Sequence, residues 1–247
     1  MLFLKKIIAA CISNGITGKV LRVLFSNKVS IHGAKIDTNY AEIKNHVFSE
    51  IFFKLYESAE IRFLFKYVPP QTTVVELGSS IGVVSSILSV NKEPLQIFCI
   101  EANPNLINII NNNLELNSKL RYQVDNYLIT SPDKSNGTAW FSFGNDNTTG
   151  KKSENKGDAL VPTVSLSEYL SKNEIKDYVL ISDIEGEESE LLFNDPESLE
   201  NCQMLIIELH NTNRQEGAVS VNDMKDQILE LGFTILDSYG PNYVFVR

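Results

Sequence analysis

The chain has 247 residues, of which 43% are hydrophobic and 21% are charged, and its mean hydropathy is −0.08. This composition suffices for one large α/β domain with a short extension, and it excludes a disordered chain, a collagen-like chain and an integral membrane protein. The net charge of −9 and the pI of about 4.9 disfavour nucleic acid as a partner, because an acidic surface repels phosphate groups.

The first predicted element is an amphipathic surface helix that reaches about residue 24. Its cationic members are Lys5, Lys6, Lys19 and Arg22. The apolar run 7–12 is too short for a signal-peptide core and for a membrane span. Two interpretations remain open: the helix contacts a membrane surface or a partner, or it packs on its own domain, which we favour.

Residues 1–70 are predicted to form an N-terminal helical extension, separate from a main domain at 71–247. Within this extension the pattern predicts a short strand at 29–31. Apolar residues then recur at helical spacing over 48–68, until a pair of prolines ends the helix.

Beyond residue 72, apolar strand patterns alternate with helix patterns, which is typical of an α/β, doubly wound and mostly parallel sheet. The predicted strands are 73–77, 95–100, 121–129, 178–184, 204–208, 234–239 and 243–247. The last two form a C-terminal β-hairpin, so we expect seven strands.

Three helices are predicted between these strands. One spans 83–90, one opens at Asn103 as N-cap, and one starts with a capping box at Ser220. An additional short strand is predicted at 138–143. The polar segment 144–159, which contains three glycines, is predicted to be a mobile loop.

The cysteines give no metal-ligand spacing and no disulfide framework, because Cys11, Cys99 and Cys202 lie far apart. We therefore expect a reducing compartment, the cytoplasm. His32 and His46 fall in the N-terminal extension and are interpreted as structural or surface residues.

A glycine turn, Glu-Leu-Gly-Ser-Ser-Ile-Gly at 76–82, joins a predicted strand to a predicted helix. Gly78 and Gly82 permit a tight turn and close approach of a ligand, and the following helix offers free N–H groups. The G-x-x-x-G spacing disfavours a nicotinamide site, which needs G-x-G-x-x-G. A tight turn without any ligand is the alternative.

Glu101 ends the next predicted strand, 19 positions beyond Gly82. An acidic residue about 20 positions past a glycine-rich turn can accept hydrogen bonds from both ribose hydroxyls. A solvated glutamate at a strand end is the alternative, but the two motifs together favour a nucleoside site.

Two acidic motifs follow the predicted strands 178–184 and 204–208. Asp183 and Glu185 end the first strand, where open α/β sheets place their ligand crevice. The acids that come next are interpreted as partners of a helix dipole: Glu187 and Glu188. Glu208 and His210 share one face of the second strand end, so His210 is the histidine expected beside the crevice.

These motifs, in this order, resemble the FkbM-type S-adenosylmethionine-dependent methyltransferases over about residues 50 to 247. The similar segments are Tyr56-Glu57 with Glu60 (Y-E-x-x-E), 76–82 (D-x-G-A-N-x-G), 101–104 (E-P-N-P), 161–166 (V-P-x-x-x-L), 183–188 (K-I-D-I-E-G-x-E) and 206–210 (I-x-E-x-H). Two positions depart from the family pattern. Ser80 replaces the usual Asn, and Ser182 replaces the usual Lys, which puts specificity or activity in question.

The resemblance implies a class I, Rossmann-like fold and O-methylation, often of a sugar hydroxyl in a polysaccharide, glycolipid or secondary metabolite. The residues implied to hold the donor, S-adenosylmethionine, are Glu76, Gly78, Ser79, Ser80, Gly82, Glu101, Ala102, Asp125 and Asn126. Glu76 would meet the ammonium group, Glu101 the ribose, and Asp125 or Asn126 the adenine.

For catalysis we expect His210 or Asp183 to act as the base, with Glu185 and Glu208 orienting the base or the acceptor. Binding of Mg²⁺ or Mn²⁺ by these four residues is an alternative that ranks lower, and no metal ligand is assigned. The expected acceptor is a small molecule or a glycan. A non-catalytic donor-binding or scaffold protein is the rival interpretation, and the oligomeric state is not predicted.

Overall fold

The computed structural model describes residues 12–117, 121–144, 150–153, 156–184, 186–214 and 217–247. The predicted site residue Glu185, the cationic Lys5 and Lys6, and Cys11 lie outside these ranges.

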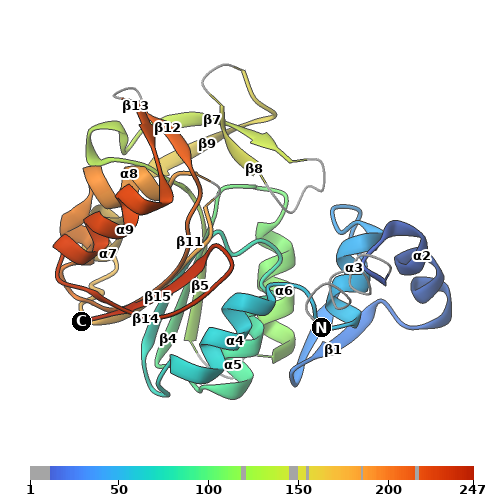
Figure 1. The fold of residues 1–247 in the computed structure, drawn as a ribbon. Helices are drawn as coiled ribbons and strands as arrows, with labels where there is room; N and C mark the ends of the chain where they lie inside the picture. The colour runs from blue at the N-terminus through green and yellow to red at the C-terminus, as the bar shows by residue number, and fades with distance from the viewer. Residues whose placement is uncertain (1–11, 118–120, 145–149, 154–155, 185, 215–216) are drawn as a thin grey trace.

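Seven strands form the central sheet, in the order β14-β15-β11-β10-β3-β4-β5 (Figure 1). The five parallel strands are β3 (Thr73–Leu77), β4 (Gln96–Glu101), β5 (Arg121–Asn126), β10 (Tyr178–Ser182) and β11 (Cys202–Glu208). β15 (Asn242–Val246) runs antiparallel to both of its neighbours, β11 and β14 (Thr234–Tyr239). The predicted strand count and C-terminal hairpin are confirmed, and the reversed strand makes the sheet mixed.

Helices cover both faces of this sheet, which is why its inner strands are buried along almost their whole length (Figure 1). One face packs against α4 (Ser58–Tyr67), α5 (Val83–Asn91) and α6 (Ile107–Asn117). The other face packs against α7 (Leu166–Lys172), α8 (Glu188–Asn194) and α9 (Val221–Glu230). Alternate strand residues therefore enter two separate cores.

Two of the three predicted helix starts are confirmed. α5 follows the glycine turn, and the capping box of Ser220 and Asp223 opens α9. α6 begins three residues later than its predicted first residue, because Asn103 accepts a hydrogen bond from the Asn105 N–H (3.1 Å) in a preceding turn.

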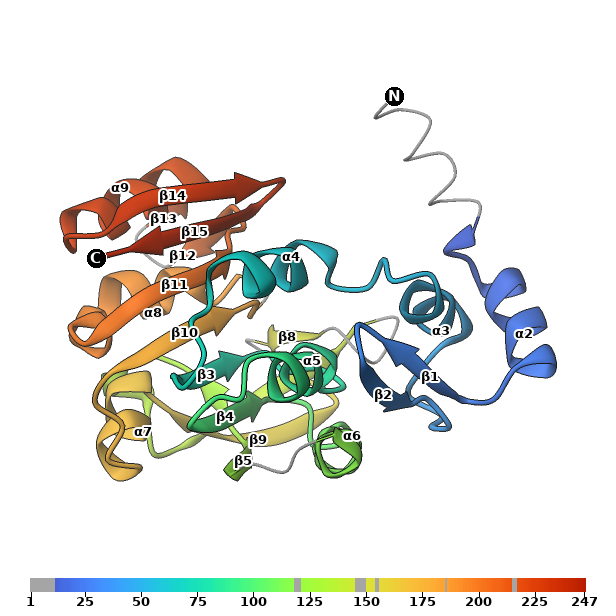
Figure 2. The ribbon, with the colours of Figure 1, turned by 90° about the horizontal axis from the view of Figure 1, so that it is seen from below.

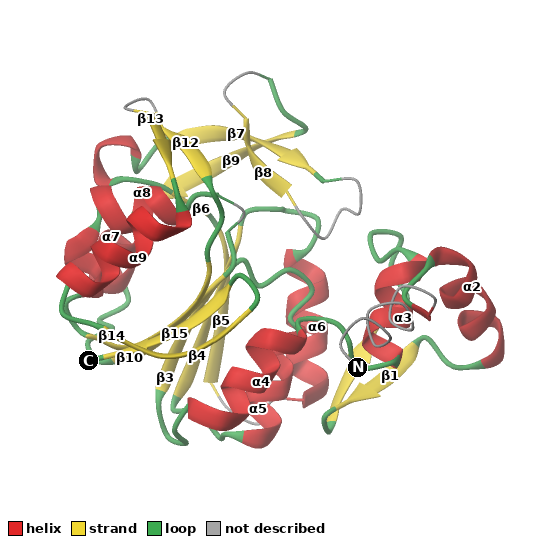
Figure 3. Cartoon of the chain, in the orientation of Figure 1, coloured by secondary structure: helices red, strands yellow, loops and turns green. Residues whose placement is uncertain are grey.

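A second, four-stranded sheet lies at the end of the molecule where the parallel strands end (Figure 3). Its strands are β6 (Leu128–Ile129), β7 (Thr138–Phe143), β8 (Gly150–Ser153) and β9 (Ala159–Val164). Two predictions are corrected here. The strand predicted over 121–129 divides into β5 and β6, which join different sheets, and the predicted loop 144–159 contains β8. Short 3₁₀ turns at Pro132–Lys134 and Pro196–Leu199 and a small hairpin of β12 (Thr212–Arg214) and β13 (Gly217–Val219) complete this part.

The helix predicted over 48–68 is two helices, α3 (Asn45–Phe52) and α4. Lys54 and Glu57 have φ values of 59° and 46°, and this left-handed backbone between the two helices breaks the helical path. The helical end before the proline pair is as predicted. The break matters for function, because it turns Tyr56 and Glu57 toward the carboxyl end of the sheet.

The remaining N-terminal elements are α2 (Gly15–Leu24), β1 (Lys28–Ile31) and β2 (Ala34–Asp37). β1 confirms the predicted short strand, and its partner β2 packs against α6, where the Asp37 N–H donates to Asn113 Oδ1 (2.8 Å). Arg22, one of the predicted cationic members of this helix, lies on the side of α2 that packs against the protein. Its guanidinium donates to the carbonyls of Thr38 (2.8 Å) and Ile43 (2.9 Å), and burial lowers its pKa.

Within the described ranges, every helix is too short or too polar to cross a bilayer.

Candidate functional site

The site lies where the chain reverses the direction in which it builds the sheet. From β3 the chain adds β4 and β5 on one side, and it then crosses to place β10 and β11 on the other side. The chain therefore leaves the carboxyl ends of the neighbouring strands β3 and β10 in opposite directions. Open α/β sheets bind ligands in the crevice between two such connections.

The glycine turn closes tightly against β10. Gly78 has a φ of 79°, and a Cβ atom there would lie 1.9 Å from the carbonyl oxygen of Asp183. The Gly78 N–H donates to the Ile100 carbonyl (2.9 Å), which fixes the turn to β4 as well. Gly82 (φ 74°) then provides the left-handed N-cap of α5. Only glycine permits both this approach and this backbone at position 78.

Glu101 links the turn to the end of β4. Its carboxylate accepts hydrogen bonds from the backbone N–H groups of Ser80 (2.8 Å) and Asn103 (2.7 Å). Burial raises the pKa of Glu101 to about 7. A carboxylate has about four acceptor positions, so acceptor capacity remains for a further donor such as a ribose hydroxyl.

Glu76 lies beneath the turn rather than on its surface. Its buried carboxylate accepts a hydrogen bond from the Ser85 hydroxyl, and burial raises its pKa to about 7. The hydroxyl of Ser79 donates to the Glu76 carbonyl (3.3 Å). The Ser80 hydroxyl, at a residue with a φ of 48°, lies 3.0 Å from the hydroxyl of Tyr56.

Asp125 and Asn126, at the end of β5, face opposite sides of the sheet. Asn126 Nδ2 donates to the carbonyls of Glu101 (2.8 Å) and Ala102 (2.9 Å), so it lies beside the predicted donor site. The Asp125 carboxylate instead accepts a hydrogen bond from the Tyr169 hydroxyl (2.6 Å) of α7. The structure thus brings Asn126 next to Glu101 and turns Asp125 away.

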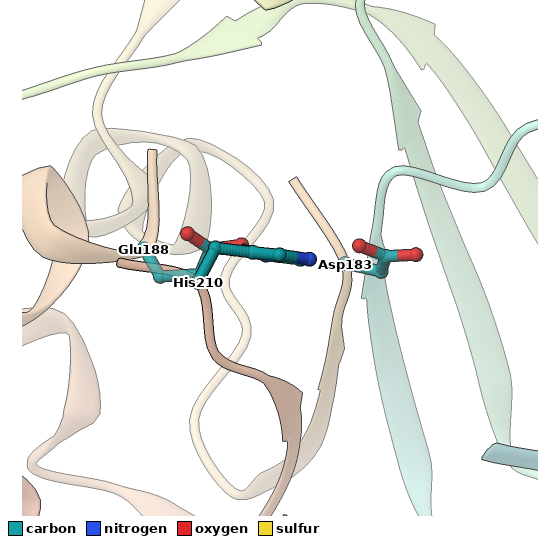
Figure 4. Close-up of side chains that lie close together, drawn as sticks. All are labelled: Asp183, Glu188 and His210. Atoms are coloured by element: carbon teal, nitrogen blue, oxygen red, sulfur yellow. Dashed lines mark hydrogen bonds and ion pairs between the residues drawn. The ribbon is translucent and has the colours of Figure 1, made fainter. Parts of the chain in front are cut away.

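Across the crevice, His210 lies between two carboxylates. Its Nδ1 is 3.0 Å from Glu188 Oε1, and its Nε2 is 3.2 Å from Glu208 Oε1. These two partners raise the pKa of His210 to about 10, so the ring carries two protons at neutral pH. The contact with His210 in turn lowers the pKa of Glu208. Figure 4 shows the ring of His210 between Glu188 and Asp183.

Glu188 was missed as a site residue by the sequence reasoning. We interpreted it only as a partner of the helix dipole, and it does begin α8, but its side chain is fully buried against His210. A signal was available, because Glu188 is the last residue of the segment similar to K-I-D-I-E-G-x-E.

The Y-E-x-x-E segment supplies three further residues that sequence reasoning used only for the resemblance. Tyr56, Glu57 and Glu60 line a pocket together with Glu76, the glycine turn and Asp183. Burial and the neighbouring Glu60 and Asp183 raise the pKa of Glu57 well above its ordinary value. Burial, together with the nearby carboxyl of Glu208, raises the pKa of Glu60 to about 7. Carboxyl groups in close proximity disfavour one another's ionised forms.

Asp183, Glu188 and His210 each offer one ligand atom, and these atoms lie within 4.8 Å of one another. A divalent cation could occupy such a group only if His210 were neutral, because a metal binds the deprotonated ring nitrogen. A metal at this group and an imidazolium at His210 therefore exclude one another, and the two flanking carboxylates stabilise the imidazolium.

Ser182, which stands where a lysine is usual, is buried on the sheet face that packs against α7 and α8. Its hydroxyl has no hydrogen-bond partner within the described part of the chain. Lys152 of β8 provides a cation near this end of the sheet, with its Nζ 3.5 Å from Glu187 Oε2.

These features define a Rossmann-like protein with a nucleoside-type turn and an acidic crevice. The model of the methyltransferase FkbM domain matches residues 77–235, which is more than half of the chain. The chain belongs to the FkbM methyltransferase domain family. Comparison with curated proteins gives no significant match.

Several solved structures are similar at low sequence identity. One is a protein in the NADB-Rossmann superfamily from Streptococcus agalactiae (14% identity, TM-score 0.42, 76% of this chain and 65% of that one). Another is a TehB-like SAM-dependent methyltransferase from Corynebacterium glutamicum (12% identity, TM-score 0.41, 76% of this chain and 86% of that one). A third is M. capricolum TrmK in complex with S-adenosylhomocysteine (12% identity, TM-score 0.43, 75% of this chain and 65% of that one). The chain spans less than two thirds of the first and third of these proteins.

Proposed function

We propose that this methyltransferase acts on a hydroxyl group, that of a sugar in a glycan, a glycolipid or a secondary metabolite. The observation that carries this proposal is the placement of Asp183 at the junction of the two halves of the site. Its backbone carbonyl meets Gly78 of the donor turn, and its side chain faces the acidic crevice with His210.

The donor supplies an electrophilic methyl group on a sulfonium. In our proposal Gly78, Ser79, Ser80 and Gly82 hold its methionine portion, and Glu76 attracts its ammonium group directly or through water. The remaining donor contacts are assigned to Glu101 at the ribose and to Ala102 and Asn126 near the adenine. Asp125, which we also expected there, is bound by the Tyr169 hydroxyl instead. Holding the acceptor oxygen in line with the methyl carbon is worth up to about 7–11 kcal/mol.

We assign the base to Asp183. A base must begin without its proton, and His210 with a pKa of about 10 is protonated at neutral pH. The acceptor oxygen forms the new bond to carbon, the carbon–sulfur bond gives its electron pair to sulfur, and the hydroxyl proton passes to the Asp183 carboxylate. His210, fixed by Glu188 and Glu208, orients the acceptor by donating a hydrogen bond. Glu185, which we also expected to orient, lies outside the described residues.

Asp183→Asn tests this assignment. The loss of the base is expected to lower kcat by roughly 10²–10⁴-fold while the dissociation constant for the donor stays unchanged. Asp177→Asn, an exposed carboxyl at the opposite end of the same strand, is the matched control. Normal turnover by Asp183→Asn would show that the base lies elsewhere.

The rival function is a donor-binding protein without turnover, and the buried Ser182 in place of the usual lysine is the observation that favours it. A labelled-methyl assay against a panel of glycans, glycolipids and small alcohols separates the two, together with calorimetry for S-adenosylmethionine and S-adenosylhomocysteine. Donor binding without any labelled product supports the rival. The buried free thiols of Cys99 and Cys202 support the expected cytoplasmic location.

A further inference from the structure

An apolar surface on α2 is exposed to solvent. It consists of Ile16, Val20, Val23, Leu24 and the following Phe25, whose exposed fractions are 81%, 52%, 81%, 68% and 52%. The four helical residues follow the i, i+4, i+7, i+8 spacing of one helix face. Isolated apolar side chains on a surface are ordinary, but five neighbouring ones on a single element mark a contact surface.

The opposite side of α2 is fixed to the protein, so this surface cannot turn inward. A Cβ atom at Gly18 would lie 1.7 Å from the Asn45 carbonyl oxygen, which shows how closely α2 and α3 pack. Arg22 anchors the same side through Thr38 and Ile43, and its guanidinium lies 4.6 Å from the centre of the Phe48 ring. The helix is therefore a rigid support that presents its apolar side outward.

The charge of the N-terminal residues indicates which kind of partner this apolar surface binds. The first 36 residues contain six lysines and arginines and no aspartate or glutamate, although the whole chain has a net charge of −9. Lys19 is exposed on α2 itself. The Lys28 side chain, just beyond α2, is 59% exposed, and its Nζ lies 3.8 Å from Asp37 Oδ2. A cationic, apolar helix face complements an anionic surface with an apolar interior, which is the interface of a bilayer that contains anionic lipid. A second copy of this chain would bring the same positive charge to the same face.

We propose that α2 docks the protein on membranes that contain anionic phospholipid. Figure 2 shows α2 at the end of the molecule opposite the C-terminal hairpin, so the helix can meet a flat surface. α2 packs on α3, and the chain continues from α3 into the segment that carries Tyr56 and Glu57. Docking by α2 does not depend on the identity of the methyl acceptor.

Sedimentation of the full chain with vesicles tests this proposal. The vesicles contain phosphatidylcholine alone or phosphatidylcholine mixed with phosphatidylglycerol. We expect binding to the mixed vesicles only, and a decrease as salt is added, because the charge contribution is screened. The double variant Ile16→Ser/Val23→Ser should lower the partition coefficient by at least about 10-fold, since two aliphatic side chains are no longer buried. Lys19→Glu should weaken binding to the mixed vesicles, and the loss should be largest at low salt, where the charge contribution is least screened.

Leu95→Ser/Leu160→Ser is the control, because these side chains are exposed to 58% and 54% outside α2. It should bind like the wild type, and circular dichroism should show that all variants are folded. Wild-type protein that stays in the supernatant, or an equal loss in the control, overturns the proposal. So does light scattering that shows a dimer which Ile16→Ser/Val23→Ser converts to a monomer, since the surface would then join two copies. Donor binding and methyl transfer are measured without vesicles, so failure of the catalytic proposal is a separate result.

Discussion

Raising the pH should destabilise the native state through His210. The two flanking carboxylates raise the pKa of its ring from 6.5 to about 10. The charged ring therefore contributes its full stabilisation below about pH 6.5, and this contribution is lost as the pH rises through about 10. In that window the folded chain keeps a proton that the unfolded chain has released.

The size of the effect follows from the proton count. One extra proton in the native state changes the free energy of unfolding by at most about 1.4 kcal/mol per pH unit. The His210 side chain is 31% exposed, so water screens the two ion pairs and we take about half of this limit. The wild type should then lose about 1.4 kcal/mol between pH 8 and pH 10 through this residue.

Urea unfolding of the wild type and of His210→Gln at pH 8, 9 and 10 measures this loss as a difference between the two proteins. Other groups that titrate in the window contribute equally to both and cancel. The carboxyls of Glu60, Glu76 and Glu101, with pKa values of about 7, have released most of their protons before it begins. Glu188→Gln, which removes the largest cause of the shift, should reduce the difference. Parallel loss of stability in the wild type and His210→Gln would mean that the ring is neutral, and His210 would again qualify as the base.

Three other outcomes are expected. Gly78→Ala should lower the free energy of unfolding by more than about 1 kcal/mol, because its backbone is left-handed and a Cβ atom there would overlap the Asp183 carbonyl. Gly15→Ala, with open space around the added Cβ atom, should not lower it. Equal stability of the two variants in urea would contradict the close approach of Gly78 to Asp183. Glu101→Gln should raise the dissociation constant for S-adenosylhomocysteine at least about 10-fold, as expected for one lost charge-assisted hydrogen bond; calorimetry should find no change for the exposed Glu115→Gln. Dialysis against EDTA should leave turnover intact, and a loss that Mg²⁺ restores would argue for a metal between Asp183 and its neighbours.

The central sheet could be predicted because its strands are buried on both faces. An inner strand such as β10 at Tyr178–Ser182 is then mainly a continuous run of apolar residues. The N-terminal break could not be predicted in this way. The apolar spacing continues from Ile51 to Leu64, and nothing in a hydrophobic pattern signals that Lys54 and Glu57 take left-handed backbone.

The sequence predicts which residues lie at the strand ends, but it does not predict which side chains contact one another there. Asp183, Glu208 and His210 follow strands that the pattern identifies, so their common edge could be inferred. The pairing of His210 with Glu188 depends on how α8 packs, and an acid in the first turn of a helix has the same local appearance whether it serves the dipole or a histidine. Asp125 and Asn126 show the same limit, because their neighbours decide which of them faces Glu101.

The charge of the crevice connects its two halves. Glu57 and Glu60 have raised pKa values partly because each lies near other carboxyls, so a cation nearby would stabilise their ionised forms. The methyl donor of the proposed reaction has a positive sulfonium and its product does not, so we expect these carboxyls to attract the donor before transfer and the product less afterwards. His210 has the complementary role, since a neutral ring would leave Glu188 as an isolated buried charge. In the proposed reaction, an imidazolium held by Glu188 and Glu208 keeps the acceptor side charged throughout, which is why we assign the proton of the acceptor to Asp183 and not to His210.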